Sequence, residues 1–226
     1  MASAHLVLAS GSPARLAILR GAGVAPSVVV SEVDEEDALA AARERFGELA
    51  PAEAVLALAQ AKAEAVASSL LAQEAEADAI GVQVADSVLL GCDSMLEIDG
   101  EVRSKPGTPA EALRCWRQQR GRTGVLHTGH WLIDLRSPGR GGTGGTLGAT
   151  SSTTVTFADL DDDEIAAYIA TGEPLHVAGA FTIDGLGGPY IDRIEGDHHG
   201  VIGLSLPLLR ELLAKMGLKF SHLRNP

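Results

Sequence analysis

The chain has few cysteines, few aromatic residues and a shortage of positive charge. Its 226 residues include only two cysteines, Cys92 and Cys115. Two are too few for a disulfide framework, and their spacing is not that of metal ligands. We therefore expect a reducing compartment, the cytoplasm. Lysine and arginine number 18 against 30 acidic residues, which gives a formal net charge of −12. This balance argues against nucleic acid and anionic membranes as partners, so any phosphate-bearing ligand must be held locally by a few cations, backbone N–H groups or a metal ion.

Four further sequence features are missing. No run of roughly 18 uninterrupted apolar residues predicts a membrane span, and the first residues lack the basic start of a signal peptide. Neither the Gly-x4-Gly-Lys-[Ser/Thr] phosphate loop nor the dinucleotide pattern Gly-x-Gly-x-x-Gly after the first strand is present. What remains is a chain with 46% hydrophobic residues and no evident linker, for which we expect a single α/β domain over residues 1–226.

The hydrophobic periodicity predicts a β-α-β opening. Residues 5–10 read as a strand, residues 12–23 as a turn and a helix closed by Gly21 or Gly23, and residues 26–37 as a second strand that ends in acids. A long helix is expected over residues 51–80, starting at Pro51. Further on, the pattern predicts a strand ending at Asp93, a hairpin turn at 99–101, helices over 108–121, 161–172 and from Pro207, and short strands within 176–206. The Gly-rich residues 137–150 are expected to form a mobile, dispensable surface loop between two strands.

The break in LVLASGSPARLAIL, residues 6–19, has two interpretations. The hydroxyls of Ser10 and Ser12, the Gly11 amide and the first N–H groups of the helix could converge on an anion, with Arg15 adding a planar cation. Equally, Ser12 could simply cap a helix that has Pro13 at its first position. The turn alone does not decide between the two.

Carboxylates recur at two places where chemistry could occur. The stretch from Ser31 to Asp37 could be a solvated helix start, or one or two of its acids could hold a divalent cation. Asp93 follows an apolar run, where a strand end would point into a ligand crevice, so it could serve as a metal ligand or general base. An Asp-Ser pair is also an ordinary turn signal.

Two rival sites are less favoured. Cys92 could act with His127 or His130, but strand alternation should point it away from the face that Asp93 uses, which favours a buried, inert thiol. His198 and His199 could suggest a metal pair. On an extended chain, consecutive residues face opposite sides, so we expect at most one of them to reach a given ion.

Seven blocks of the sequence, taken in order, resemble the Maf family of nucleoside triphosphate pyrophosphatases. They span nearly the whole chain and read LASGSPAR, VDEE, LAQAKA, GCDSMLEIDGEVRSKP, EIAAYIATGEP, AGAFTIDG and GVIGLSLPLL. The resemblance implies a mixed, twisted sheet flanked by helices in two lobes around a deep cleft, as in inosine triphosphate pyrophosphatases. It also implies Mg²⁺ or Mn²⁺ dependence, a cytoplasmic location and frequent dimerisation.

The resemblance assigns roles residue by residue. Asp93 matches the catalytic aspartate and, with Glu35, the metal site, while the matching substrate-binding residues are Ser10, Ser12, Arg15, Lys62 and Lys105. The reaction would release a nucleoside monophosphate and pyrophosphate, clearing non-canonical or excess nucleotides. The alternative is a nucleotide-binding regulator of cell division or septum formation that does not need catalysis.

Three positions depart from the branch of the family that acts on dTTP and UTP. Ala14 replaces the first arginine of the opening motif, Ser94 replaces the threonine after the catalytic aspartate, and Asp184 replaces a glutamine. A carboxylate accepts hydrogen bonds and donates none, so glutamine-like reading of a pyrimidine is not expected at Asp184. The same Ala14 does not match the aromatic residue of the 7-methyl-GTP branch, so the base preference stays open.

Overall fold

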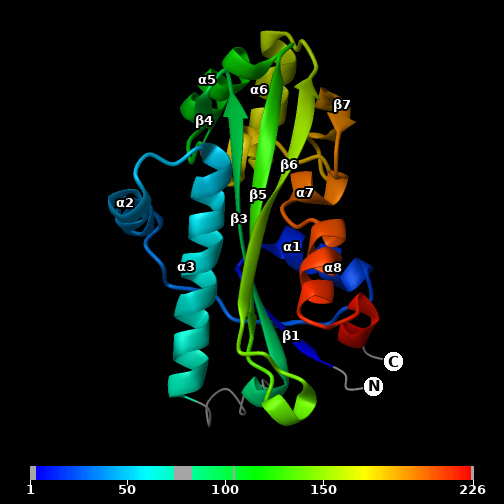
Figure 1. The fold of residues 1–226 in the computed structure, drawn as a ribbon. Coiled ribbons are helices and arrows are strands. Elements are labelled where there is room, and N and C mark those ends of the chain that lie inside the picture. Colours follow the sequence, from blue (N-terminus) through cyan, green and yellow to red (C-terminus); the bar gives the residue numbers. More distant parts are fainter. Residues whose placement is uncertain (1–3, 74–82, 104, 225–226) are drawn as a thin grey trace.

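A twisted seven-stranded sheet runs through the whole molecule in this computed structural model, which describes residues 4–73, 83–103 and 105–224. The strand order is β2-β1-β3-β5-β6-β7, with β4 paired to β3. The β2-β1 and β1-β3 pairs are parallel and all the other pairs are antiparallel. The predicted α/β class with a mixed sheet and flanking helices is therefore confirmed (Figure 1).

The sheet consists of strands β1 (His5–Ala9), β2 (Ser27–Val28), β3 (Ser87–Ile98), β4 (Glu101–Arg103), β5 (Thr123–Asp134), β6 (Thr146–Phe157) and β7 (Ile191–Glu195). The α-helices that the structure describes are α1 (Pro13–Gly21), α2 (Glu35–Phe46), α3 (Pro51–Ala72), α5 (Pro109–Gln119), α6 (Asp162–Ala170), α7 (His198–Ile202) and α8 (Leu206–Lys215). Short 3₁₀ turns connect several of them.

Strand β1 is buried on both faces, and its side chains alternate between two cores. Leu6 and Leu8 pack in a cluster with residues of α1 and α8. Val7 and Ala9 point the other way, into a cluster with residues of α3. In Figure 1, α3 accordingly lies along one side of the sheet, while α1 and α8 lie on the other.

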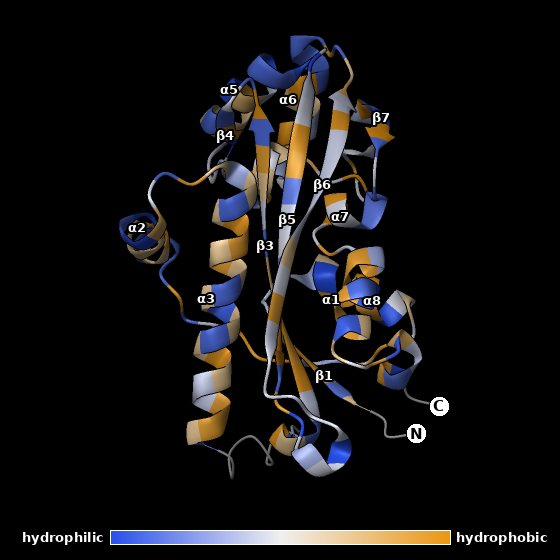
Figure 2. Cartoon of the chain, in the orientation of Figure 1, coloured by the Kyte–Doolittle hydropathy of each residue, from blue (hydrophilic) through white to orange (hydrophobic). Residues whose placement is uncertain are grey.

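Helix α3 lies close to the sheet because glycines remove the side chains beneath it. A Cβ on Gly129 of β5 would lie 2.3 Å from the Val55 carbonyl oxygen, and one on Gly91 of β3 would lie 2.2 Å from that of Ala59. By length and composition α3 could cross a membrane. Its apolar bands (Figure 2) instead include fully buried residues that pack on the sheet, which is the pattern of a core helix.

A separate core surrounds Trp116 where α5 and α6 cover the far end of the sheet. Trp116 packs edge-on against Phe157 and Tyr168, and its indole N–H donates to the Ala180 carbonyl at 2.9 Å. The helix caps here follow the sequence: the Thr108 hydroxyl accepts from the Glu111 N–H. The Glu111 carboxylate does not bond back to the cap and pairs with Arg114 instead.

One edge of β3 changes partner along its length, and this change positions the site. Strand β1 pairs with β3 up to Gly91, and β4 pairs with it from Leu96 onward. Among the described residues, no strand pairs with residues 92–95 on this side. The loop after β1 and the start of α1 therefore face an open stretch of strand edge.

Several sequence predictions of local structure were wrong. The second strand comprises only Ser27–Val28, and the acids that follow it begin helix α2, with Asp34 as its N-cap. The long helix ends at Ala72, and the rest of its predicted range, up to residue 80, lies mostly outside the described residues. The region 176–206 contains short 3₁₀ turns, irregular segments and helix α7, with β7 as its one named strand.

The Gly-rich segment is not a free loop. Residues 146–150 belong to β6, and the hairpin tip before them is anchored on the buried Asp134. This carboxylate binds the Arg136 guanidinium at 2.8 Å and accepts from both the N–H and the hydroxyl of Thr143. Burial raises the pKa of Asp134, but these donors outweigh it and hold the pKa below its ordinary value. The Gly-rich composition predicted a mobile loop. Composition does not show the buried Asp134–Arg136 ion pair that anchors the hairpin tip.

Candidate active site

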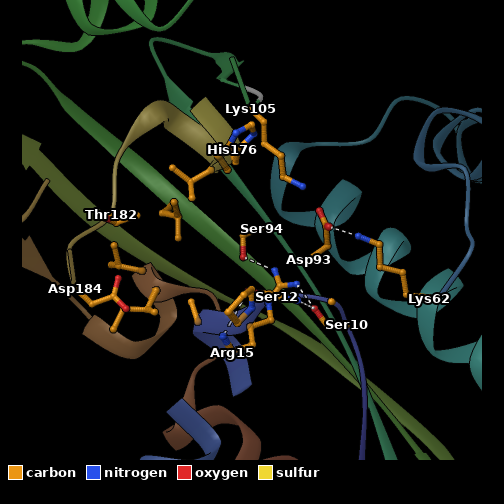
Figure 3. A pocket seen from close by; sticks show the side chains of 18 of the residues that line it. Ser10, Ser12, Arg15, Lys62, Asp93, Ser94, Lys105, His176, Thr182 and Asp184 are labelled. Atoms are coloured by element: carbon orange, nitrogen blue, oxygen red, sulfur yellow. Dashed lines mark hydrogen bonds and ion pairs between the residues drawn. The ribbon is translucent and has the colours of Figure 1, made fainter. Parts of the chain in front are cut away.

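A cavity of about 600 Å³ opens beside the unpaired edge of β3. Its lining comes from the loop after β1 and the start of α1, the segment before α2 and its first residue, α3, β3, the loop after β4, β5, the segment after α6, and α7. All the residues selected from the sequence line it, namely Ser10, Ser12, Ala14, Arg15, Glu35, Lys62, Asp93, Ser94, Lys105 and Asp184. Figure 3 shows how most of these side chains lie around the hollow.

The opening loop is both a helix cap and a wall of the cavity. The Ser12 hydroxyl accepts from the Arg15 N–H, with Pro13 in the first turn of α1, as the capping interpretation predicts. The Ser10 hydroxyl accepts from the Ser12 N–H at 3.3 Å and from the Arg15 guanidinium at 3.0 Å. Because both serines also line the cavity, the two interpretations of this loop do not exclude each other.

Arg15 lies at the centre of the site and is held by four hydrogen bonds. Its Nε donates to the Gly203 carbonyl at 2.8 Å, and one terminal nitrogen donates to the Cys92 carbonyl at 2.9 Å as well as to Ser10. The other terminal nitrogen donates to Ser94 Oγ at 3.0 Å. The guanidinium thus joins α1 to the open edge of β3 and to the turn after α7.

Lys62 joins two carboxylates at one end of the cavity. Its Nζ lies 2.7 Å from Glu35 Oε1 and 2.6 Å from Asp93 Oδ1. Asp93 is 7% exposed, and Lys62 reaches it from the face of α3 that lies on β3. The ammonium group therefore bridges the two carboxylates.

The electrostatics around Glu35 favour its charged form. Burial raises the pKa of this carboxyl, but the Lys62 hydrogen bond and the charges of Lys62, Lys105 and Arg15 together bring the pKa below its ordinary value. Glu35 is the member of the acidic stretch that lines the cavity. Asp34 instead caps α2, accepting from the N–H groups of Glu36 and Asp37.

Asp93 is not at a strand end. It lies in the middle of β3, opposite Gly129 of β5, and the strand that ends beside it is β1. The apolar run predicted a terminus because a polar residue interrupts it. Asp93 instead lies where the edge of β3 is no longer paired with β1. Its carboxylate therefore still faces a crevice.

The rival sites have other arrangements. Cys92 is fully buried among the residues of the first core, and burial raises the pKa of its thiol to about 12, which agrees with an inert thiol. His127 hydrogen-bonds Glu97 and Ser152 instead. His198 and His199 begin α7, so they are helical and not extended, and their rings lie 3.8 Å apart. The expected opposite orientation of these two histidines was wrong.

The far end of the cavity has a different chemical character. Phe181, Thr182 and Ile183 line it together with Val201 and Ile202 of α7, and Asp184 adds a polar group. Reasoning from single residues missed all of these except Asp184, since apolar side chains and turn residues carry no chemical signal of their own. The sequence block AGAFTIDG, which resembles the family, was one signal that could have indicated them.

Comparisons with known proteins show the family of the chain. The family model described as "Maf-like protein" matches residues 5–216. The chain belongs to the Maf-like family. A relative from Leifsonia xyli subsp. xyli is 51% identical, with 98% of this chain and 97% of the relative covered. One from Streptomyces coelicolor is 50% identical (98% and 95%), and one from Nocardia farcinica is also 50% identical (98% and 97%). Each of these Maf-like relatives is named nucleoside triphosphate pyrophosphatase.

Proposed function

We propose that this Maf-like protein hydrolyses nucleoside triphosphates to a nucleoside monophosphate and pyrophosphate with the help of a divalent metal ion. The observation that carries the proposal is the cluster of Glu35, Lys62 and Asp93 at one end of a cavity whose wall is the serine-rich opening loop. The names and high identity of the relatives support the same activity.

The end of the cavity that contains Glu35, Lys62 and Asp93 suits a triphosphate. Lys62 and Lys105 supply positive charge, and Ser10 and Ser12 supply hydroxyl donors next to the start of α1. Phosphoryl transfer depends mainly on positioning and on neutralising charge that spreads over the phosphate oxygens. We assign these four residues to holding the phosphates, with Arg15 fixing the loop that presents them.

Asp93 is the best-placed general base. An ionised carboxylate can accept the proton of a water that attacks the α-phosphorus, while the bond to the β-phosphate breaks and pyrophosphate leaves. Lys62 orients Asp93 through the 2.6 Å contact. Because Asp93 is almost buried, its charge is poorly screened and its effect on a nearby proton is large.

The donor set fits a hard divalent cation. Glu35 and Asp93 offer carboxylate oxygens, which Mg²⁺ and Mn²⁺ prefer, and Lys62 holds the two carboxylates close together. We assign the metal to these two residues. When bound, it would neutralise charge on the phosphate oxygens.

The opposite end suits a nucleobase. Apolar groups of Ile183, Val201 and Ile202 offer a surface for a flat ring, and Asp184 offers hydrogen-bond acceptors. A base edge with two N–H donors complements a carboxylate better than a pyrimidine edge that presents one donor and acceptors. Ala14 and Ser94, which also line the cavity, leave room where the family's pyrimidine-specific branch has larger residues. We further propose a cytoplasmic location and a homodimer, with neither nucleic acid nor membrane as a partner.

Asp93→Asn tests the reaction. The amide is nearly isosteric but cannot accept the water's proton as a carboxylate does, so kcat should fall by about 10²–10⁴-fold while the folded structure remains. The measurement is pyrophosphate release from a panel of canonical and modified triphosphates with Mg²⁺ or Mn²⁺, together with a thermal melt.

The matched control is Asp192→Asn, which makes the same change at an exposed position of β7. It should retain wild-type rates. Full turnover in Asp93→Asn would refute the base assignment. Binding of triphosphates by the wild type without any pyrophosphate release would favour a nucleotide-binding regulator.

A further inference from the structure

Glu173, just after α6, accepts hydrogen bonds from a loop that it does not adjoin in sequence. One carboxylate oxygen accepts from the Tyr168 hydroxyl at 2.9 Å, the Thr182 hydroxyl at 2.5 Å and the Gly187 N–H at 3.0 Å. The other accepts from the Leu186 N–H at 3.0 Å. Three of these four donors belong to residues 182–187, so a single side chain fixes both ends of that segment.

The close fit between Glu173 and the loop leaves no space for a side chain at position 185 or 187. A Cβ on Gly185 would lie 2.5 Å from Glu173 Oε2, and one on Gly187 would lie 2.5 Å from the Tyr168 hydroxyl oxygen. That hydroxyl also accepts from the Thr182 N–H. Glycine at 185 and 187 therefore allows the backbone to close around the carboxylate.

The same loop is a wall of the cavity. Thr182, Ile183 and Asp184 line it at the end away from Lys62, as Figure 3 shows for Thr182 and Asp184. If the triphosphate lies against Lys62 and the opening loop, the nucleobase must lie towards this wall. Glu173 itself does not line the cavity, so it can act on the base only through the loop.

We propose that Glu173 is a positioning residue for nucleobase recognition, holding residues 182–187 in the conformation that presents Thr182 and Asp184 to the base. The inference rests on the proposed function. It requires both oxygens of Glu173 to accept hydrogen bonds and neither to donate, as only the ionised carboxylate does. Burial raises the pKa of Glu173, but the donors from Thr182, Leu186, Tyr168 and Gly187 outweigh burial and lower it.

Glu173→Gln tests the role because it keeps the shape and replaces one acceptor by an NH₂ donor. At least one loop N–H or hydroxyl then faces a donor, and the loop must shift. We expect KM for the preferred triphosphate to rise at least 10-fold and kcat to change less than 3-fold. The differences in kcat/KM between the preferred triphosphate and the other triphosphates should become correspondingly smaller.

Inorganic tripolyphosphate, used as a competitive inhibitor, separates this role from general damage. It has no base, so its Ki should be the same in the wild type and in Glu173→Gln. The matched control is Glu164→Gln on the exposed face of α6, which should leave every constant unchanged. Tyr168→Phe removes one donor outside the cavity, so it should give a smaller effect in the same direction even if Glu173→Gln folds poorly.

Unchanged KM and base ranking in Glu173→Gln would overturn the proposal. An equal rise in KM and in the tripolyphosphate Ki would also overturn it, because the damage would then extend to the phosphate end. A wild-type protein that releases no pyrophosphate from any triphosphate would instead refute the proposed function, and the role of Glu173 with it.

Discussion

Arg15 ties together three segments that are far apart in the sequence. Its hydrogen bonds to the carbonyls of Cys92 and Gly203 and to the hydroxyls of Ser10 and Ser94 use most of its donors. Ser94 continues the chain to Thr128, which donates to the Gly200 carbonyl at 2.8 Å. A guanidinium can do this because its donors point in fixed, divergent directions.

Arg15→Lys is therefore expected to behave almost like Arg15→Ala. The ammonium keeps the charge but cannot reach Gly203, Cys92 and Ser94 together, so buried acceptors lose their donors. We expect the free energy of unfolding to fall by about 2 kcal/mol and KM for the triphosphate to rise about 10-fold. Urea denaturation and steady-state kinetics measure the two effects.

Arg20→Lys provides the comparison on the same helix, since Arg20 lies exposed in the last turn of α1. It should change neither quantity. A stable, fully active Arg15→Lys protein would show that Arg15 contributes only its charge.

The sequence predicted many of the site residues but not how each one acts. Ser12 was weighed as a cap or as a ligand, and it is a cap whose loop also lines the cavity. The resemblance indicated Glu35, but the residues alone did not show whether Asp34 joins it, because the turn between strand and helix was unknown. In the structure Asp34 caps α2. Roles of this kind depend on a backbone direction that composition does not encode.

Helix α3 carries Lys62 and depends on glycine in the strands beneath it. The close approach at Gly129 places the Val55 carbonyl where a methyl group would otherwise lie. Any side chain at this position must push the helix away from β5. The position of Lys62 relative to Asp93 therefore depends on glycine at position 129 of β5.

Gly129→Ala should lower both stability and activity. An added methyl group 2.3 Å from a backbone oxygen has no rotamer that relieves it, so we expect a loss of about 2 kcal/mol or more in the free energy of unfolding. Since α3 must move, kcat/KM should fall as well. Chemical denaturation and pyrophosphate release are the two measurements.

Gly139→Ala is the corresponding control, because a Cβ there meets nothing within 4 Å. It should leave both quantities unchanged. If Gly129→Ala also did so, the helix would be free to shift without consequence and the proposed coupling would be wrong.

Elements marked by strong local signals were predictable, whereas those fixed by distant contacts were not. Thr108, Pro51 and Pro207 mark helix starts through a cap and proline, and the structure begins α5, α3 and α8 within one residue of them, at Pro109, Pro51 and Leu206. The stretch after Pro26 is rich in valine and predicted a long strand, but only Ser27 and Val28 pair with β1. Strand length depends on the partner, which here is itself only five residues long.

The cavity arises because one sheet serves two packed regions. The two cores that pack on β1 and the core around Trp116 lie at different lengths along β3. Between them β3 loses its edge partner, and the turn after α7 closes over this gap through Gly203. His130 supports that turn from β5: its Nε2 accepts from the Ser205 N–H at 2.8 Å, at the start of α8.

The burial of His130 makes the stability of the whole molecule depend on pH. Burial lowers the pKa of this imidazole from 6.5 to about 4, despite the opposing hydrogen bond with the Thr128 carbonyl. Above pH 6.5 the ring is neutral in both states, so its contribution to stability is complete. Between pH 6.5 and 4 only the unfolded chain gains the proton, and the free energy of unfolding should fall by on the order of 3 kcal/mol.

Carboxylates with lowered pKa values, such as Asp134, also lose stabilising charge in acid, so the histidine must be isolated by comparison. Urea denaturation of wild type and His130→Gln at several pH values between 7 and 4 does this, because every other group is common to both proteins. The wild type should lose about 3 kcal/mol more than the variant across this range. His198→Gln, at an exposed position, should follow the wild-type curve. Parallel curves for wild type and His130→Gln would mean that the imidazole can be protonated without disturbing the turn that closes the cavity.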